Sequence, residues 1–506
     1  MIRLSLSRLR LLALGTLLIP GIIFLFTWVQ PVWAIPCVFA LTGAFLLYRK
    51  SLFDSIHLPV FGKSKEIQLP ILTVLACLAC AALWTALSGI GGFFYQNDDF
   101  YGRNAIFHDL LNYHWPVHFP GTEYALTYYI GYWMVPSLLG KITSYLIGGQ
   151  YLWELANIFL YLETVWFLFL IFLLFLTLLD ITKTVSACFF LLVFVMFSGM
   201  DGLACYFLGD WTDQIEWWAQ TWQFSSFTTC LFWVFNQAVP AWLATLLLLT
   251  DIDNVSAYAL IGLSVLPFAP LPLTGLAVLC IGLFILKAAR SLVSGRQTEF
   301  KKTVTSVLSP CNLLSIIGSI PVLFYLLSNE STKEAPFRFD LFLYAYSLQE
   351  SLLRLMWFSL VEWAIYALLL IPACRHSSLF LLCSAELVFV PMFRVGYNMD
   401  FSMRASIPAL LVLCVLCSRQ IRNFCITHSK VQKVCTILLV IAMLIGAITP
   451  LLEFERGAYN IKMHGFERRF ADPFGTVLHP DADTANFICR DTTSSFFYQH
   501  LARNAD

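Results

Sequence analysis

The chain has 506 residues, of which 59% are hydrophobic and 12% are charged, and its formal net charge is zero. The charged fraction is about half that of an ordinary soluble domain, so polar side chains are too scarce to cover a soluble fold of this length. A neutral chain also lacks the basic surface of a nucleic-acid-binding protein, so we expect no nucleic acid as a partner. The composition predicts an all-α, polytopic transmembrane helical bundle embedded in a lipid bilayer.

Apolar segments long enough to cross a membrane recur along the chain. A hydrocarbon core about 30 Å thick needs roughly 20 residues of helix. The first apolar segment follows Arg3, Arg8 and Arg10, as in a signal peptide, but it is too long and a second segment follows directly, so we expect an uncleaved helix. About thirteen spans are predicted, at 10–29, 32–48, 69–90, 151–179, 186–205, 227–250, 255–268, 271–288, 305–327, 355–373, 378–393, 404–418 and 433–452.

The distribution of lysine and arginine predicts the orientation. If the N-terminus is cytoplasmic, most of the 31 basic residues fall in cytoplasmic loops. The outer loops between spans then hold only Arg103, Lys141, Lys333, Arg338, Arg354, Arg394 and Arg404. This bias predicts a multi-pass protein of the cytoplasmic (inner) membrane, with its N-terminus inside and its C-terminus outside.

Residues 124–146 are apolar enough to cross, but counting them as a span would place the basic loops 287–302 and 419–433 outside. We therefore expect an interfacial or re-entrant helix on the outer side. The predicted organisation is a transmembrane domain over 1–452, with outer loops at 91–150, 206–226 and 394–403. An extracytoplasmic tail over 453–506 follows it.

The segment 96–110, just beyond a predicted span, carries the first candidate chemistry. Two adjacent carboxylates, Asp98 and Asp99, repel each other at the membrane edge, which tends to raise one pKa and prepare a general base. The same residue types are also favoured as caps of a following helix. The residue types alone leave both interpretations open.

The second outer loop combines carboxylates with tryptophans, including Glu216, Trp217 and Trp218. Indole rings cover the apolar face of a pyranose and carboxylates accept bonds from its hydroxyls, so the segment suits a sugar site. Tryptophan also collects at membrane interfaces without binding anything, and this aromatic belt is the alternative.

The third outer loop, 394–403, ends beside Arg404. An arginine at interface depth can hold a lipid phosphate through its planar, forked donors. Pairing with Asp400, four residues earlier, is the alternative.

Other ionisable residues suggest no organised site. Glu154, Glu163, Glu362 and Glu386 lie singly in predicted spans, without the inverted repeat of many transporters. The histidines form no metal-ligand spacing. Cys77 and Cys80 have CxxC spacing but lie in an uninterrupted apolar segment without companion ligands, so no protein-held metal is predicted. No cofactor is implied, and a divalent cation is compatible with the chemistry but has no ligand motif.

Several short strings of residues, in order over most of 90–420, resemble one protein class. They are Asp99 to Leu110, Trp115-Pro116-Val117, Tyr128-Tyr129-Ile130-Gly131-Tyr132, Pro136 with Gly140-Lys141, Phe197 to Asp201, Glu216-Trp217-Trp218, and Asn398 to Ser406 without Ser402. Together they resemble the GT-C class of membrane glycosyltransferases, and more narrowly a group of its bacterial members. Two positions depart from that pattern, because Arg103 and Gln237 stand where histidine is commoner.

The resemblance implies a polyprenyl-phosphate-linked sugar as donor and a glycan or other envelope acceptor on the outer face, joined by an inverting transfer. It implies Asp99 as catalytic base, with Asp98 as its less favoured neighbour. Arg404, and after it Lys141 and Arg394, would bind the donor phosphate. The sugar and acceptor would be bound by Arg103, Asn104, Asp109, Glu216, Trp217, Trp218, Gln237, Asn398 and Asp400.

Two other functional classes stay open on the sequence. A lipid-linked sugar flippase or transporter would place charges along a transmembrane path. A non-catalytic envelope-assembly protein would use its loops only for binding. Convergence of Asp99 and Arg404 at one outer face would favour the enzyme.

Overall fold

The computed structural model describes residues 1–54, 66–209, 211, 214–334, 337–339, 347–395, 400–466, 475–479 and 484–504. Asn398, one of the predicted sugar-binding residues, lies outside these described residues. Helices dominate the described part of the chain, and its strands are two to four residues long.

The α-helices are α1 (Leu6–Trp28), α2 (Pro31–Asp54), α3 (Ile71–Leu87), α4 (Asp99–Asn112), α5 (Gly131–Leu146), α6 (Leu152–Leu178), α7 (Thr184–Val195), α8 (Asp201–Leu208), α9 (Phe227–Thr250), α10 (Tyr258–Leu263), α11 (Pro270–Val293), α12 (Gln297–Val307), α13 (Pro310–Leu327), α14 (Glu330–Glu334), α15 (Leu348–Ser359), α16 (Ile365–Cys374), α17 (Ser378–Phe389), α18 (Asp400–Ala405), α19 (Ile407–Arg422), α20 (Lys430–Gly446) and α21 (Ile448–His464). Short 3-10 or π segments are η1 (Ile90–Gly92), η2 (Ile215–Trp217), η3 (Val255–Ala257), η5 (Leu360–Ala364), η6 (Val390–Met392), η8 (Thr484–Asn486) and η9 (Phe497–Leu501). The strands β1 (Ile2–Ser5), β2 (Glu66–Leu69), β3 (Ala125–Leu126), β4 (Arg338–Phe339), β5 (Phe393–Arg394) and β6 (Ile488–Cys489) form the antiparallel pairs β1–β2, β3–β6 and β4–β5.

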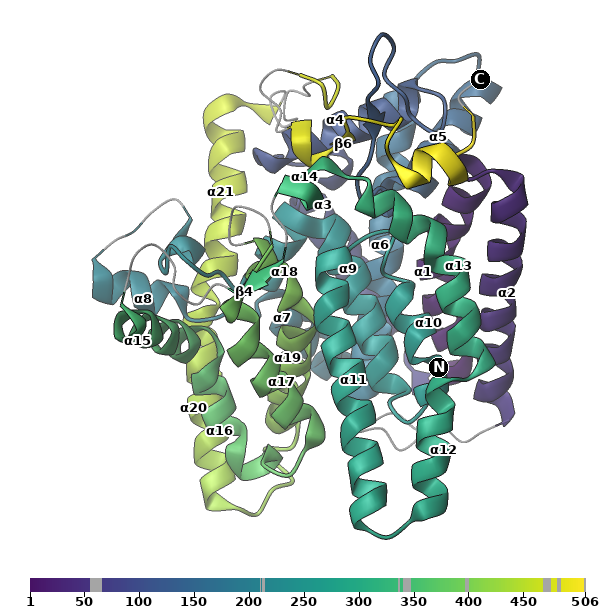
Figure 1. Ribbon diagram of the computed structural model, residues 1–506. Coiled ribbons are helices and arrows are strands. Elements are labelled where there is room, and N and C mark those ends of the chain that lie inside the picture. Colours follow the sequence, from purple (N-terminus) through teal and green to yellow (C-terminus); the bar gives the residue numbers. More distant parts are fainter. Residues whose placement is uncertain are drawn as a thin grey trace.

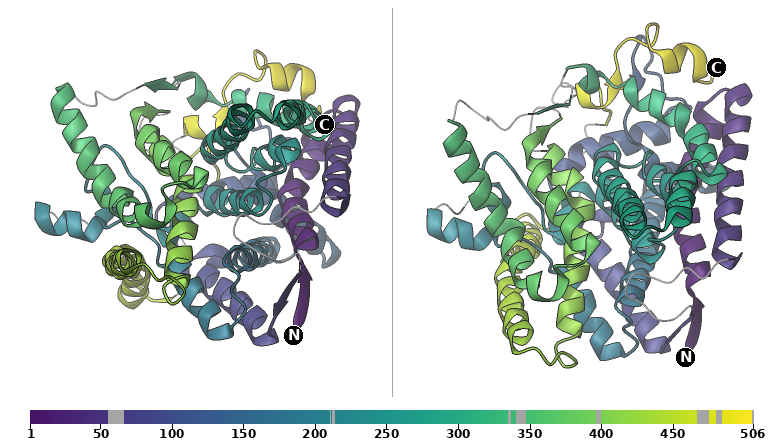
Figure 2. Two further views of the ribbon diagram at one scale, coloured as in Figure 1. Left: turned by 90° about the horizontal axis from the view of Figure 1, so that it is seen from below. Right: turned by 60° about the horizontal axis from the view of Figure 1, so that its bottom comes forward.

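The helix α9 is the centre of the bundle. The apolar part of α9 is 94% buried inside the protein, whereas that of α2 is 33% buried. A helix that is apolar on all sides is stable only when other helices or lipid surround it. α9 packs against α1, α6, α11 and α19, while α2 and α20 lie at the margins of the bundle (Figures 1 and 2).

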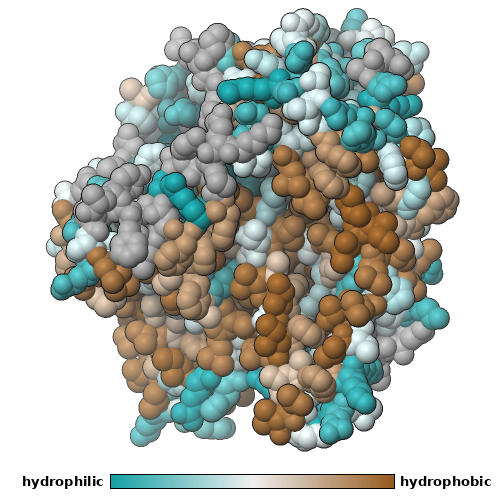
Figure 3. All heavy atoms as spheres, viewed as in Figure 1, coloured by the Kyte–Doolittle hydropathy of each residue, from teal (hydrophilic) through white to brown (hydrophobic). Residues whose placement is uncertain are grey.

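The prediction of a helical membrane protein is confirmed at this level. Among the described residues, eight helical segments are long and apolar enough to cross a bilayer: Leu6–Trp28, Pro31–Phe53, Leu152–Leu178, Phe227–Thr250, Pro270–Val293, Gln297–Leu327, Leu348–Cys374 and Lys430–His464. Three shorter apolar helices are Ile71–Leu87, Thr184–Val195 and Ser378–Met392. Hydrophobic side chains gather over the middle and lower part of the face in Figure 3, and hydrophilic ones at its top and lower tips. The count of thirteen crossings stays a prediction.

Two predicted spans are not continuous helices in the structure. Within 255–268 the chain forms only η3 and the six-residue helix α10. Residues 186–205 were expected to be continuous, but α7 ends at Val195 and α8 begins at Asp201. A Cβ on Gly199 would overlap the carboxyl group of Glu362. The chain therefore leaves the helix where a close approach to η5 is required, and only glycine allows that approach.

The upper end of the bundle in Figure 1 holds α4, α5 and the last described residues, which arrive from a distant part of the sequence. The segment 124–146 is not one helix, because β3 precedes α5 and pairs with β6 of the tail. The predicted domain boundary at 452/453 falls inside α21, and the tail packs back on the membrane domain. The N-terminus lies at the opposite end (Figure 2).

Candidate functional site

The first turn of α4 is fixed by an asparagine and not by the adjacent carboxylates. Asn97 Oδ1 accepts a hydrogen bond from the backbone N–H of Asp99 (3.2 Å), and Asn97 Nδ2 donates to the carbonyl of Phe232 on α9 (2.9 Å). Asp98 occupies the N-cap position but makes no capping bond with its side chain. The carboxylates of Asp98 and Asp99 are therefore not used to cap α4, although residue types alone had allowed it.

The Asp99 side chain points to a buried arginine one turn along the helix. Arg103 Nη2 donates to Asp99 Oδ2 at 2.7 Å, and the two side chains are 9% and 45% exposed. The Arg103 guanidinium also lies 5.6 Å from the ring centre of Phe235 on α9. Arg103 therefore binds Oδ2 of Asp99, and the other oxygen of this half-exposed carboxylate, Oδ1, stays accessible.

Two tyrosines and a second arginine meet this pair. The rings of Tyr128 and Tyr129 lie 3.7 Å apart, and Gln237 Nε2 on α9 donates to the hydroxyl of Tyr129 (3.3 Å). The charges of Arg103 and Arg404 both act on these two tyrosines, and the charge of Asp99 acts on Arg404. Burial, with the neighbouring hydroxyl, raises the pKa of Tyr128.

Arg404 reaches this group from α18. Its Nη1 atom pairs with Asp400 Oδ2 at 2.8 Å, as the spacing of the two residues predicted. The structure thus brings together Asp99, Arg103, Gln237, Asp400 and Arg404, from three helices, around the two tyrosines. We call these seven residues the Asp99 cluster.

Three polar atoms of the Asp99 cluster have no hydrogen-bond partner among the described residues. They are the buried Arg103 Nη1, Arg404 Nε and Gln237 Oε1. An unpaired buried polar group costs about 1–3 kcal/mol, more when it is charged. Two arginine donors and one amide acceptor at one place therefore favour a polar, anionic ligand.

The second predicted loop forms a separate cluster. Glu216 is buried and caps α9, because its Oε1 accepts from the N–H of Ser226 and its Oε2 from Gln223 Nε2, both at 2.9 Å. Burial and the nearby carboxyl group of Asp201 raise the pKa of Glu216 to about 8. Trp217 donates to Gln223 Oε1 (3.1 Å) and stays half exposed.

Asp201 and Glu362 complete this second cluster. The two buried carboxyl groups lie against each other, which requires a proton on one of them for a hydrogen bond to form. Trp218 Nε1 donates to Glu362 Oε1 (2.9 Å), and Thr449 donates to Asp201 Oδ2 (2.8 Å). These bonds tie η2, η5 and α21 together, so Trp218 serves the packing of the loop.

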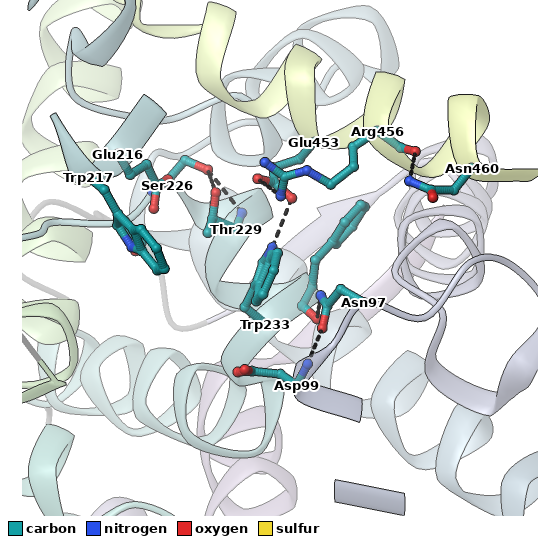
Figure 4. A network of polar contacts seen from close by, with 12 residues as sticks. Asn97, Asp99, Glu216, Trp217, Ser226, Thr229, Trp233, Glu453, Arg456 and Asn460 are labelled. Carbon is teal, nitrogen blue, oxygen red and sulfur yellow. Dashed lines mark hydrogen bonds and ion pairs between the residues drawn. The ribbon is translucent and has the colours of Figure 1, made fainter. Parts of the chain in front are cut away.

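The second cluster lies at the first turn of α9, and Gln237 of the Asp99 cluster lies further along the same helix. Thr229 and Ser226 lie beside Glu216, and one turn later Trp233 Nε1 donates to Glu453 Oε2 of α21 (2.9 Å). Figure 4 shows Glu216, Ser226 and Thr229 in one view with Asn97 and Asp99, and Trp233 is drawn between Glu453 and Asp99.

Other predicted site residues lie elsewhere. Asn104 is buried and donates to Gln96 Oε1 (2.9 Å), which fixes the loop before α4. Lys141 donates to the carbonyl of Tyr113 (2.8 Å) and covers the ring of Trp115, and burial lowers its pKa to about 8. Tyr113 follows α4, so Lys141 lies roughly 20 Å along that helix from Asp99 at 1.5 Å per residue.

Asp109 and Arg394 are also held by other parts of the fold. The fully buried Oδ2 of Asp109 accepts from the N–H of Val477 (3.0 Å) and from Thr476 (3.2 Å), so this carboxyl group fastens the tail to α4. Arg394 lies opposite Arg338 in the β4–β5 pair. Neither residue belongs to the Asp99 cluster.

Tyr128, Tyr129 and Asn97 were not predicted as site residues. The two tyrosines belong to a quoted string, but nothing in their spacing indicated their contact with α9. Among the described residues, no group of three or more His, Cys, Asp or Glu side chains could hold a metal ion. Comparison of the chain with protein-family models, curated proteins and solved structures finds no match.

Proposed function

We propose that the protein is a membrane glycosyltransferase that moves a sugar from a polyprenyl-phosphate-linked donor to an acceptor hydroxyl, with Asp99 as general base. One observation carries the proposal. A half-exposed carboxylate and two arginines with unsatisfied buried donors meet at one end of an apolar helical bundle. A lipid-linked phosphate and a water-soluble hydroxyl can meet only at such a membrane edge.

The proposed transfer uses the two oxygens of Asp99 differently. Oδ2 is held by Arg103, so Oδ1 takes the proton of the acceptor hydroxyl. The acceptor oxygen forms a bond to the anomeric carbon as the bond from that carbon to the phosphate oxygen breaks. The electron pair of the broken bond leaves with the lipid phosphate, and the configuration at the anomeric carbon is inverted. A positioned base of this kind contributes about 10²–10⁴ in rate.

Arg404 is the preferred ligand of the leaving phosphate. Its Nε is buried without a partner among the described residues, whereas Lys141 is engaged by Tyr113. Arg103 Nη1 is a second donor without a partner in the described part of the chain. Positive groups lower the activation barrier most when they are already fixed where negative charge develops in the transition state. Asp400 fixes Arg404 in this way, and Asp99 fixes Arg103.

We place the Asp99 cluster on the extracytoplasmic side of the cytoplasmic membrane. The basis is the excess of lysine and arginine at the other end of the bundle. The N-terminus is then cytoplasmic, and the tail is outside with the Asp99 cluster.

The first experiment compares Asp99→Asn with the parent in proteoliposomes that contain a panel of polyprenyl-phosphate sugars. The amide keeps the shape of the carboxylate but cannot take a proton. We expect transfer to fall by about 10²–10⁴. Donor binding and unfolding temperature should change far less, because the amide oxygen can still accept from Arg103. Asp98→Asn should have a milder effect, because it removes only a neighbouring charge.

Glu350→Gln is the control for the loss of a carboxylate, since Glu350 pairs with Arg354 on the lateral helix α15. If Asp99→Asn keeps parental transfer and Asp98→Asn or Glu216→Gln is inactive, the base must be reassigned. If all three variants are active, the mechanism fails. If the protein moves the lipid-linked sugar across the bilayer, and none of the three substitutions changes the rate of that movement, the flippase is favoured.

A second prediction concerns Arg404→Lys. The lysine keeps one charge but loses the planar fork and the buried Nε donor, so donor binding should weaken by about tenfold, which corresponds to ~1.4 kcal/mol. Binding of a polyprenyl-phosphate analogue, measured by native mass spectrometry, checks this. Lys141→Gln should bind the analogue like the parent, and equal binding by Arg404→Lys would remove the assigned role.

A further inference from the structure

Helix α15 projects from the side of the bundle and runs across the direction of the apolar helices. In Figure 1 it lies across α16 and α20, and in the view from below (Figure 2, left) its full length is visible while α20 is seen end-on. The apolar segment Leu348–Cys374 has the length of a span. Its first part, α15, nevertheless runs sideways, as a helix does when it lies in the plane of a membrane surface.

One stripe of α15 fixes this helix to the second outer loop. Ser351, Leu355 and Phe358 are its buried residues. The ring centre of Phe358 lies 4.9 Å from that of Phe224 and 5.8 Å from that of Trp222. Aromatic packing against the loop therefore determines which side of α15 faces the protein and which side faces outward.

The outward side of α15 divides into an apolar face and a charged edge. Glu350 and Arg354, four residues apart, form an ion pair of 3.2 Å on the edge. The apolar face has one polar residue within it, Gln349, and its five apolar side chains are 45–58% exposed: Leu348, Leu352, Leu353, Met356 and Trp357. Helices that lie at a membrane surface have this arrangement, because the apolar face enters the lipid while the charged edge stays in water.

Helix α8 adds aromatic side chains on the same side of the bundle. Tyr206 and Phe207, in its last turn, are 70% and 77% exposed, and Leu208 after them is 61% exposed. Tyrosine and tryptophan concentrate at membrane interfaces, where one end of the ring is apolar and the other is hydrated. Together with Trp357, these residues give this side of the protein the composition of an interfacial belt.

The position of α8 and α15 along the bundle is that of a membrane edge. α8 contacts both α20 and α21, and it also contacts η5, from which α15 projects. The helix α20 ends in the apolar run before Gly446, whereas α21 carries Glu453, Arg456 and Lys462. A change from apolar to charged residues along a helix marks the end of the hydrocarbon core.

We infer that α15 and the end of α8 lie in the boundary between the headgroups and the acyl chains of the lipid leaflet at the α4 end of the bundle. The leucines, Met356 and Trp357 face the acyl chains. Phospholipid is the occupant that these observations favour, because α15 continues directly into the apolar α16, and its neutral Glu350–Arg354 pair offers no net charge to a complementary protein. The inference does not depend on the proposed transfer activity.

The test measures the depth of spin labels on the full chain in phosphatidylcholine bilayers. Single cysteines are introduced as Met356→Cys, Arg354→Cys and Phe207→Cys, after the exposed native Cys188 and Cys425 are replaced by serine. Oxygen concentrates in the acyl region, and a nickel chelate stays in water. We expect the labels at Met356 and Phe207 to meet oxygen more than nickel, at a depth of about 5–10 Å. The label at Arg354 should meet nickel more than oxygen.

Two reference positions calibrate the measurement. Phe39→Cys places a label on α2, where Phe39 is 73% exposed in an apolar span, and it should lie deeper than the label at Met356. Ser494→Cys places a label in the exposed part of the tail and should meet mainly nickel. The background protein without an introduced cysteine gives the signal to subtract.

Four results would overturn the inference. Labels at Met356 and Arg354 that both meet mainly nickel would place α15 in water, with its apolar face open to a soluble protein. Labels at both positions as deep as the one at Phe39 would make α15 part of a span. A label at Met356 that meets neither reagent would show that a second copy of the chain covers the face. A label at Phe207 that meets mainly nickel would remove α8 from the interface.

Discussion

Asp109 was predicted to bind the sugar or acceptor, but in the structure its carboxyl group holds the tail against α4. It is fully buried, its Oδ1 has no hydrogen-bond partner among the described residues, and its Oδ2 holds the tail. Burial raises the pKa of Asp109 to about 7, against an ordinary value of 3.8. The folded protein therefore keeps a proton that the unfolded chain loses near pH 4.

This shift predicts a pH-dependent stability. The contribution of Asp109 to folding is fully present below its unfolded pKa and is lost as the pH rises through about 7. Asp109→Asn cannot ionise, so it should be more stable than the parent at pH 8, and its stability should vary less between pH 4 and 7. Thermal unfolding across this range measures the effect, and the exposed Asp98→Asn serves as control. Equal pH profiles for the parent and Asp109→Asn would contradict the prediction.

Residue spacing predicted some contacts of the Asp99 cluster and missed others for a physical reason. Asp400 and Arg404 are four residues apart, and their pairing was the alternative that the sequence offered for Arg404. Asp99 and Arg103 have the same spacing and also pair, but their contact was not predicted. Gln237 and Tyr129 are 108 residues apart. Their contact depends on where α9 passes the loop before α5, and a single sequence carries no local signal for that.

At the scale of elements, α18 is positioned by its close packing on α11. A Cβ on Gly275 would overlap the carbonyl of Ala405 and lie 2.7 Å from Glu386 Oε1. The residue before Ala405 is Arg404, so this contact positions the proposed phosphate ligand. The apolar segment 271–288 predicted α11, but residues 400–403 of α18 were expected in an outer loop, so that part of the prediction is wrong. The sequence also could not predict a contact that depends on the absence of one methyl group.

Gly275→Ala should therefore displace α18. We expect a loss of about 1–3 kcal/mol in unfolding free energy, as for other overpacked sites, together with weaker donor-analogue binding. Gly15→Ala on α1 is the matched control, because a Cβ there meets no atom within 4 Å. Unfolding and binding measured on both variants would show the difference, and a Gly275→Ala protein that behaves like Gly15→Ala would rule out this account of α18.

The membrane spans were the most predictable elements, because about twenty apolar residues in a row have few other stable environments. The interruption at 196–200 was not predictable, because those residues are apolar or small. Its cause is the buried carboxyl group of Glu362, which approaches from more than 150 residues away in the chain. The tail was predicted as a separate segment because its composition is polar, yet it pairs with β3.

For the whole molecule, the bias of basic residues predicts that the two ends of the bundle face different compartments. A membrane-impermeant maleimide applied to intact cells should label a cysteine introduced as Ser494→Cys in the exposed part of the tail. It should spare the native exposed Cys425, which lies between α19 and α20. Permeabilised cells provide the control in which both react. Labelling of Cys425 alone in intact cells would reverse the orientation and move the Asp99 cluster to the cytoplasm.

The tail also has a consequence for biosynthesis. Phe487 packs on Tyr128 with ring centres 5.1 Å apart, and a Cβ on Gly102 would lie 3.1 Å from its ring. Val477 binds Asp109 across 368 residues of sequence. The ribosome synthesises α4 long before it synthesises these partners. During translation the Asp99 cluster therefore lacks the contacts that the tail makes with α4 and Tyr128. A chain stalled or cleaved after α21 would insert its helices but lack these tail contacts. Membrane insertion alone would therefore not show that the protein is completely folded.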